Sequence, residues 1–265
     1  MKKMRIYIKN IEGEDILKAE MKVKLLSYTN EPEKLVASAA KLCYSPSNIE
    51  DLMNDLTTEK IDTFVNKLMN LGHLSPFEHI NFTFGISGVS RVLETQFVRH
   101  RISSHSIQSG RYVKRDNPDY VYPKEIYNNK EALVIYEKHI EESTKRYNEI
   151  CDILEKQFIE NGMSKLNAEK KASENARYLT PQAVGVQIIT TKNLRDLWHY
   201  FNERCCMRAQ DEHRQLANMM LKECKKVSPL LFKNAGAKCV KGYCPENMYG
   251  CGLKPKLNEI LKGDK

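Results

Sequence analysis

The sequence predicts an α/β (α+β) fold, a single compact domain in which a small mixed sheet is flanked by long helices. Two observations lead to this class. Segments with the 3.6-residue apolar period of an amphipathic helix are separated by short segments in which apolar residues alternate as in a half-buried strand. The chain of 265 residues, 41% hydrophobic and 29% charged, is long enough for a buried core, and we find no repeat, low-complexity tract or flexible linker.

The elements follow from this periodicity and from the residues that begin and end helices. Proline opens the first helix, and glycine is placed to end the second helix at Gly72 and the longest helix at Gly162. In chain order we expect a strand at 21–29, helices at 31–43 and 59–71, a strand at 80–87, a helix at 87–100, a polar segment at 102–112, helices at 129–161 and 166–177, a strand at 184–188, and helices at 193–206 and 209–227.

These elements form a predicted domain at 21–235, with an N-terminal extension at 1–20 and a cysteine-containing tail at 236–265. The net charge of +8 suits a polyanionic partner, whether nucleic acid, a membrane surface or phosphorylated small molecules. No stretch approaches the about 20 apolar residues of a membrane span, and the N-terminus lacks the apolar run of a signal peptide. We therefore expect a soluble, cytoplasmic protein with free thiols.

The most informative stretch is 96–112, where cationic side chains are interleaved with hydroxyls and amides. Gln96, Arg99 and His100 are predicted to share one face of the preceding helix by their i, i+3, i+4 spacing. Arginine forks and hydroxyls can together hold a phosphate. A structural interpretation is also open, because Arg and His stabilise a helix C-terminus and a Ser-rich segment is commonly a turn. The continuation to Ser109-Gly110-Arg111-Tyr112 favours the phosphate site, since a helix cap does not need it.

This stretch resembles the signature of the flavin-dependent thymidylate synthases, in which Arg-His-Arg is followed seven residues later by Ser and then by Arg-Tyr. Four further segments resemble the same family in the expected order, and the resemblance covers most of the chain. They are His73-Leu74-Ser75-Pro76-Phe77-Glu78-His79, Asn175-Ala176-Arg177, Asn193-Leu194-Arg195 with Asn202-Glu203-Arg204, and Ala209-Gln210-Asp211-Glu212.

The resemblance implies a methyltransferase that converts dUMP to dTMP. It implies FAD as cofactor, 5,10-methylenetetrahydrofolate as carbon donor and NADPH as reductant, with tetrahydrofolate released and no obligatory enzyme nucleophile. It further implies a homotetramer with active sites shared between subunits, and neither a nucleic-acid nor a membrane partner.

The resemblance also implies the site residues. Arg204 is the implied catalytic residue, because a guanidinium against O2 and N3 of uracil favours the ionised ring and its electron-rich C5. Ser109 is assigned to positioning. The residues implied for dUMP are Gln96, Phe97, Val98, Arg99, Ile107, Gln108, Ser109, Gly110, Arg111, Arg177 and Arg204. Those implied for FAD are His73, Ser75, Glu78, Arg99, His100, Arg101, Asn193, Arg195 and Asn202.

Two features of the final helices have structural alternatives. Trp198 falls on an apolar helical face and is predicted to be core, whereas Arg195, His199 and Asn202 lie on a neighbouring polar face that is either a ligand face or simply solvated. Cys205 and Cys206 are interpreted as unreactive thiols. The tail cysteines Cys239, Cys244 and Cys251 lack the ligand number and spacing typical of zinc, so no metal is predicted.

One departure leaves the substrate open. Ile107 stands where the family usually has Glu or Gln, which is compatible with another pyrimidine nucleotide in place of dUMP, or with a flavoprotein that has lost methylation. A different class is a basic nucleic-acid-binding protein that uses Arg99, Arg101, Arg111 and Lys114. The sequence has no recognisable motif and no aromatic-interleaved basic stripe for that class.

Overall fold

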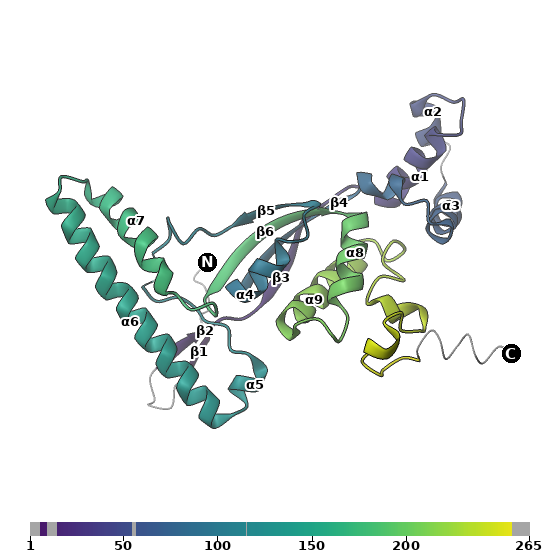
Figure 1. Ribbon diagram of the computed structural model, residues 1–265. Coiled ribbons are helices and arrows are strands. Elements are labelled where there is room, and N and C mark those ends of the chain that lie inside the picture. Colours follow the sequence, from purple (N-terminus) through teal and green to yellow (C-terminus); the bar gives the residue numbers. More distant parts are fainter. Residues whose placement is uncertain (1–5, 10–14, 55–56, 115, 256–265) are drawn as a thin grey trace. The chain divides into compact units, whose positions relative to one another are not determined.

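A computed structural model describes residues 6–9, 15–54, 57–114 and 116–255, and it confirms the predicted α/β class (Figure 1). The larger sheet has the strand order β3-β4-β6-β5 and is antiparallel. Its strands are β3 (Lys22–Tyr28), β4 (Asn81–Ser90), β5 (Ser103–Ile107) and β6 (Gly185–Asn193). Strands β1 (Ile6–Lys9) and β2 (Asp15–Lys18) form a separate antiparallel pair in which Ile6 is opposite Lys18 and Lys9 opposite Asp15.

Helices make up most of the remaining described chain. They are α1 (Pro32–Leu42), α2 (Ile49–Asn54), α3 (Thr58–Leu71), α4 (Arg91–Phe97), α5 (Lys124–Tyr127), α6 (Lys130–Glu160), α7 (Lys165–Ala176), α8 (Leu194–Arg204) and α9 (Asp211–Val227), with short 3₁₀ segments η1 (Ser75–His79), η2 (Arg177–Leu179), η3 (Lys238–Lys241) and η4 (Asn247–Tyr249).

The strongly periodic segments were predicted correctly. The long helix at 129–161 is α6, and the side chain of Asn129 caps it by accepting from the N–H of Ala132 at 3.1 Å. Gly72 ends α3 with a φ of 73°, a left-handed conformation that favours glycine. In β4, Phe82 and Phe84 are fully buried, as the alternation predicted.

The predicted helix at 87–100 is wrong at both ends. β4 continues to Ser90, and α4 begins only at Arg91. Within β4, Gly88 adopts a φ of +70° and a Cβ there would lie 2.0 Å from the carbonyl oxygen of Glu20, so this position requires glycine. Ser90 then caps α4 by accepting from the N–H of Leu93 at 3.0 Å. Since α4 ends at Phe97, the prediction that Gln96, Arg99 and His100 share one helix face is also wrong.

The polar segment at 102–112 contains a strand that the sequence analysis did not predict. β5 is the last strand in the sheet order, and its sequence is Ser-Ser-His-Ser-Ile. An edge strand does not need the alternation of polar and apolar residues that marks a half-buried one. The apolar content of the segment therefore did not indicate a strand.

The chain divides into two compact units, and all boundaries but one fall within strands of the larger sheet; the exception, between residues 98 and 99, lies between α4 and β5. Unit 1 comprises the described residues of 1–22 together with 86–98 and 106–188, and unit 2 comprises the described residues of 23–85, 99–105 and 189–265. The domain boundaries at 20 and 235 stay a prediction. The extension is described at 6–9 and 15–20, and the tail as far as residue 255.

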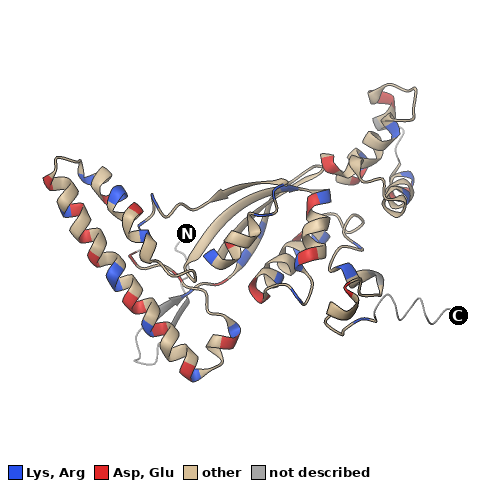
Figure 2. Cartoon of the chain, viewed as in Figure 1, with Lys and Arg blue, Asp and Glu red and all other residues tan. Residues whose placement is uncertain are grey.

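Each unit has its own packing. In unit 1, α6 packs against α7, and buried Tyr120, Tyr122, Ile140 and Val184 form a hydrophobic cluster. In unit 2, α1 packs against α3, and α8 packs against α9 and η1. Lys, Arg, Asp and Glu are interspersed along α6 (Figure 2), as on an ordinary solvent-exposed helix. No helix of the described residues is long and apolar enough to cross a membrane.

Candidate active site

His100 lies in the segment between α4 and β5 and is buried, with 8% of its surface exposed. Its ring meets Tyr200 of α8 edge-on with centroids 5.0 Å apart, and the ring of His213 of α9 lies 6.2 Å away. Burial, followed by the positive charges of Lys192 and Arg204, lowers the pKa of His100 to about 4. The imidazole is therefore neutral at pH 7.

Arg204, the last residue of α8, is oriented by this histidine. Its Nε–H donates a hydrogen bond to Nε2 of His100 at 3.1 Å. Because a guanidinium only donates, Nε2 must be an unprotonated acceptor. The bond therefore requires the neutral state that burial favours. No residue that the structure describes accepts a hydrogen bond from the two terminal nitrogens of Arg204.

A buried ion pair accompanies His100 in unit 2. Nζ of Lys192, in β6, lies 2.8 Å from Oδ2 of Asp196, in the first turn of α8, and the two side chains are 0% and 5% exposed. His213 is fully buried. Burial and the charges of Arg204, His100 and Lys192 lower its pKa to about 3. Both histidines are thus kept neutral by the same surroundings.

Three buried residues of this group were not predicted from the sequence, namely Lys192, Asp196 and His213, although one signal was present. Lys192 continues the buried alternation of Val184, Val186 and Ile188 through β6. A charged residue at an inward position of a strand is rare unless it is paired. The predicted strand ended at residue 188, so this position was not recognised.

All nine residues predicted for FAD belong to unit 2. The carboxylate of Glu78 in η1 accepts from Arg195 in α8, which joins two of the predicted segments. Asn193 caps α8, because its side chain accepts from the N–H of Asp196 at 2.8 Å. Trp198 is half-buried and packs on the buried Phe77 with ring centroids 4.9 Å apart.

The donor set of this group fits a dinucleotide that carries phosphates. His73, Ser75, Arg99, Arg101 and Arg195 are all exposed. Neither Arg99 nor Arg101 makes an ion pair with another described residue, so both guanidinium groups are available to an anion. Guanidinium forks suit phosphate oxygens, and hydroxyls complete such sites.

Unit 1 holds most of the residues predicted for dUMP, namely Gln96, Phe97, Val98, Ile107, Gln108, Ser109, Gly110, Arg111 and Arg177. Ser109 shapes the turn after β5, since its Oγ accepts from the N–H of Arg111 at 3.1 Å. The Arg111 side chain reaches α7, where its Nε lies 2.9 Å from Oε1 of Glu174. Arg177 follows Glu174 by three residues, so Arg111 and Arg177 are brought to one end of α7.

Two residues of this group are buried or half-buried. Phe97 is fully buried, so its side chain belongs to the core. Ile107 is half-buried at the end of β5, next to Gln108, whose N–H donates to the carbonyl oxygen of Gln187 at 2.9 Å. The remaining predicted dUMP residues, Arg99 and Arg204, lie in unit 2.

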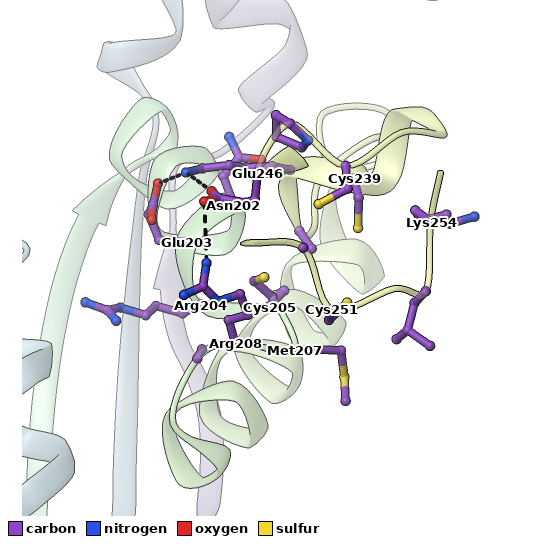
Figure 3. Close-up of a pocket in the computed structure, with 18 residues that line it drawn as sticks. Asn202, Glu203, Arg204, Cys205, Met207, Arg208, Cys239, Glu246, Cys251 and Lys254 are labelled. Atoms are coloured by element: carbon purple, nitrogen blue, oxygen red, sulfur yellow. Dashed lines mark hydrogen bonds and ion pairs between the residues drawn. The ribbon is translucent and has the colours of Figure 1, made fainter. Parts of the chain in front are cut away.

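Five cysteines line one pocket of about 400 Å³ in unit 2, formed by the chain around Arg204 and by the C-terminal segment, residues 236–255 (Figure 3). These are Cys205, Cys206, Cys239, Cys244 and Cys251. All eight cysteines are free thiols. Burial raises the pKa of Cys205 to about 12, so its thiol is unreactive. The described residues contain no group of three His, Cys, Asp or Glu arranged for a metal ion.

Comparison with known proteins agrees with the class that these motifs indicate. Residues 24–230 match the family model described as thymidylate synthase complementing protein. The flavin-dependent thymidylate synthase of Clostridium tetani is 51% identical over 240 residues, which are 91% of this chain and 96% of that protein. Proteins of the same name from Nitratidesulfovibrio vulgaris and Geobacter sulfurreducens are 42% and 37% identical, over 90% and 91% of this chain and 97% and 98% of their own length.

These matches cover most of the chain and most of each relative. The chain therefore belongs to the family of flavin-dependent thymidylate synthases.

Proposed function

We propose that the protein converts dUMP to dTMP as a flavin-dependent thymidylate synthase. Methylenetetrahydrofolate supplies the carbon, reduced FAD supplies the hydride, and NADPH supplies the electrons that reduce FAD. The observation that carries the proposal is the hydrogen bond from Arg204 to a buried, neutral His100. It fixes a guanidinium that pairs with no carboxylate among the residues that the structure describes.

Arg204 is proposed to polarise the uracil ring. A guanidinium against O2 and N3 stabilises negative charge on the ring and enriches C5, the atom that accepts the carbon. Such a group is effective when it is already oriented, because no reorganisation is then needed as charge develops. Fixing Nε on His100 leaves the two terminal nitrogens of Arg204 to face the ring.

The residues proposed to hold dUMP are those of the Arg111 turn and the end of α7. Arg111 and Arg177 are the cations at that end, and Ser109 supplies a hydroxyl and shapes the turn. Glu174 forms an ion pair with Arg111, so the phosphate of dUMP would displace this carboxylate. Arginine guanidinium groups bind phosphate in a bidentate manner, which supports this displacement of the Glu174 carboxylate by phosphate.

The flavin is proposed to be held by the residues of η1, the Arg99-His100-Arg101 segment and α8. Bound FAD would supply hydride transfer, which no side chain can perform. The exposed Arg99 and Arg101 suit its diphosphate, while Glu78 and Arg195 keep η1 and α8 together. We further propose that the protein works in the cytoplasm as a homotetramer with shared active sites.

The first experiment is a visible absorption spectrum of the purified protein, with and without added FAD, followed by anaerobic addition of NADPH and then of dUMP. We expect flavin bands that bleach with NADPH at a rate altered by dUMP. Formation of dTMP and tetrahydrofolate in the complete mixture identifies the reaction. UMP in place of dUMP tests the substrate choice that Ile107 leaves open.

A protein without flavin, even after addition of FAD, contradicts the proposal. Retardation of oligonucleotides that weakens with salt would then support the nucleic-acid-binding alternative. Flavin reduction without dTMP would indicate a relative that has lost methylation.

A further inference from the structure

Arg204 lies at the C-terminal end of a helix. It is the last residue of α8, Cys205 caps the helix, and α9 begins only at Asp211. The last carbonyls of a helix lack intrahelical partners, and helix ends fray. The position of the guanidinium therefore depends on contacts that hold the corner between α8 and α9.

The C-terminal segment makes such contacts through four charged residues, which we call the clamp. Nζ of Lys238 lies 2.9 Å from Oε1 of Glu203 and 3.3 Å from Oε1 of Glu246. Nη1 of Arg208 lies 3.7 Å from Oε2 of Glu246. Figure 3 shows these pairs as dashed lines beside the pocket. The clamp thus joins the C-terminal segment to the residue before Arg204 and to a residue four positions after it.

The charges of the clamp suit the end of a helix. Glu203 is in the last turn of α8, where the carbonyl end of the helix disfavours a carboxylate, and Lys238 brings a compensating positive charge there. Burial alone would raise the pKa of Glu203, but the hydrogen bond and charge of Lys238 outweigh it, so that this pKa is lowered. The bond to Glu203 in turn raises the pKa of Lys238.

Hydrogen bonds and close packing hold the C-terminal segment in place, so that it can support the α8–α9 corner. Before it, the indole N–H of Trp198 donates to the carbonyl oxygen of Leu231 at 3.0 Å. Within it, the N–H of Cys244 donates to the carbonyl oxygen of Pro255 at 2.8 Å, which closes a loop. A Cβ at Gly250 would lie 3.0 Å from Sγ of Cys244, so this loop is tightly packed.

We propose that Lys238 is a positioning residue for Arg204. Through Glu203 and Glu246 it holds the α8–α9 corner, and the C-terminal segment becomes part of the support of the active site. The inference rests on the proposed function, because it concerns the residue that polarises the uracil ring. The clamp residues are about as exposed as ordinary surface ion pairs, with side chains 36% to 52% exposed, so their main effect is on geometry rather than on folding.

The test compares Lys238→Met with wild type at saturating FAD, folate and dUMP. We expect kcat to fall by about three- to fivefold, the effect of losing an exposed ion pair. The flavin content should stay unchanged, because no residue of the clamp is among those proposed to hold FAD, and KM for dUMP should change less than kcat. High salt should lower the kcat of wild type towards that of the variant and leave the variant unaffected, since screening weakens exposed pairs. Lys238→Arg should restore kcat.

Lys226→Met is the matched control, because Lys226 also forms an exposed pair in unit 2, with Glu223 on α9. It should leave kcat unchanged. A double-mutant cycle with Glu203→Gln completes the test. Because Lys238→Met already removes the pair with Glu203, the double variant should be no slower than Lys238→Met.

A Lys238→Met enzyme with wild-type kcat overturns the inference, and so does a strictly additive double variant. Either result leaves the proposed function standing if the wild type makes dTMP. A wild type that binds flavin but makes no dTMP removes the proposed function and the inference together.

Discussion

Two arginines of the predicted site differ in what they contact. In unit 2, Arg204 donates to a neutral imidazole that is buried among aromatic rings and a buried ion pair. In unit 1, Arg111 pairs with the carboxylate of Glu174, and their side chains are 48% and 40% exposed. A neutral acceptor orients a guanidinium without cancelling its charge, whereas a carboxylate cancels the charge until an anion displaces it. The first arrangement suits catalysis and the second suits exchange with a phosphate.

The largest effect is expected from Arg204→Ala. Removing an oriented donor from a site of developing charge lowers kcat by about 100- to 1,000-fold. Steady-state kinetics at saturating substrates measures it, and circular dichroism checks the fold. Arg146→Ala is the control, because Arg146 is an exposed arginine of α6 that pairs with Glu142 and Glu149. Turnover of Arg204→Ala near that of the control would remove the catalytic role.

The buried histidines of unit 2 predict acid sensitivity. The pKa values of His100 and His213 are about 4 and about 3, below the ordinary 6.5, so between these limits the unfolded chain binds protons that the folded protein does not. Their contribution to stability is complete above pH 6.5 and is lost as the pH falls, through about 4 for His100 and about 3 for His213. Each adds a slope of about 1 kcal/mol per pH unit to the free energy of unfolding.

Urea unfolding at several pH values between 6.5 and 4.5 measures this slope. His213→Phe should reduce it, whatever its effect on stability at pH 7, because one of the two groups is removed. An unchanged slope would contradict the neutral, buried state of His213.

A smaller effect is expected from His100 itself. His100→Phe removes the acceptor for Nε of Arg204 and should lower kcat by about tenfold, the scale of a lost hydrogen bond to a charged group. His100→Gln keeps an acceptor and should retain more activity. Because His100 also belongs to the proposed flavin site, kcat is measured with excess FAD and referred to flavin content. Equal kcat values for the two variants would show that the hydrogen bond from Arg204 does not contribute to kcat.

The smallest effect is expected at the ion pair of Arg111 with Glu174 in unit 1. Glu174→Gln removes the charge that competes with phosphate for Arg111 and should lower KM for dUMP by about two- to fivefold. Arg111→Gln should raise it. Glu142→Gln, which weakens an exposed pair on α6, is the control. A raised KM in Glu174→Gln would mean that the carboxylate helps to hold the nucleotide, and the exchange we infer would be wrong.

The sequence by itself determined the parts of the molecule whose signal is local. Caps and periodicity predicted α6, the end of α3 at Gly72 and the buried face of β4, because each depends on neighbours within a few residues. The motifs determined the family, and they placed Arg204 and His100 among the functional residues. Local rules failed at residues 87–90, where the chain continues β4 beside the distant Glu20 instead of beginning a helix.

Only the tertiary structure decided how the site residues are paired. The hydrogen bond from Arg204 to His100 and the ion pair of Lys238 with Glu203 both join segments far apart in sequence. β5 became a strand through its place at the sheet edge and not through its polar composition. The physical reason is the same in each case. Burial and partner charges set the protonation state and direction of a side chain, and both are properties of the packed chain rather than of the residue.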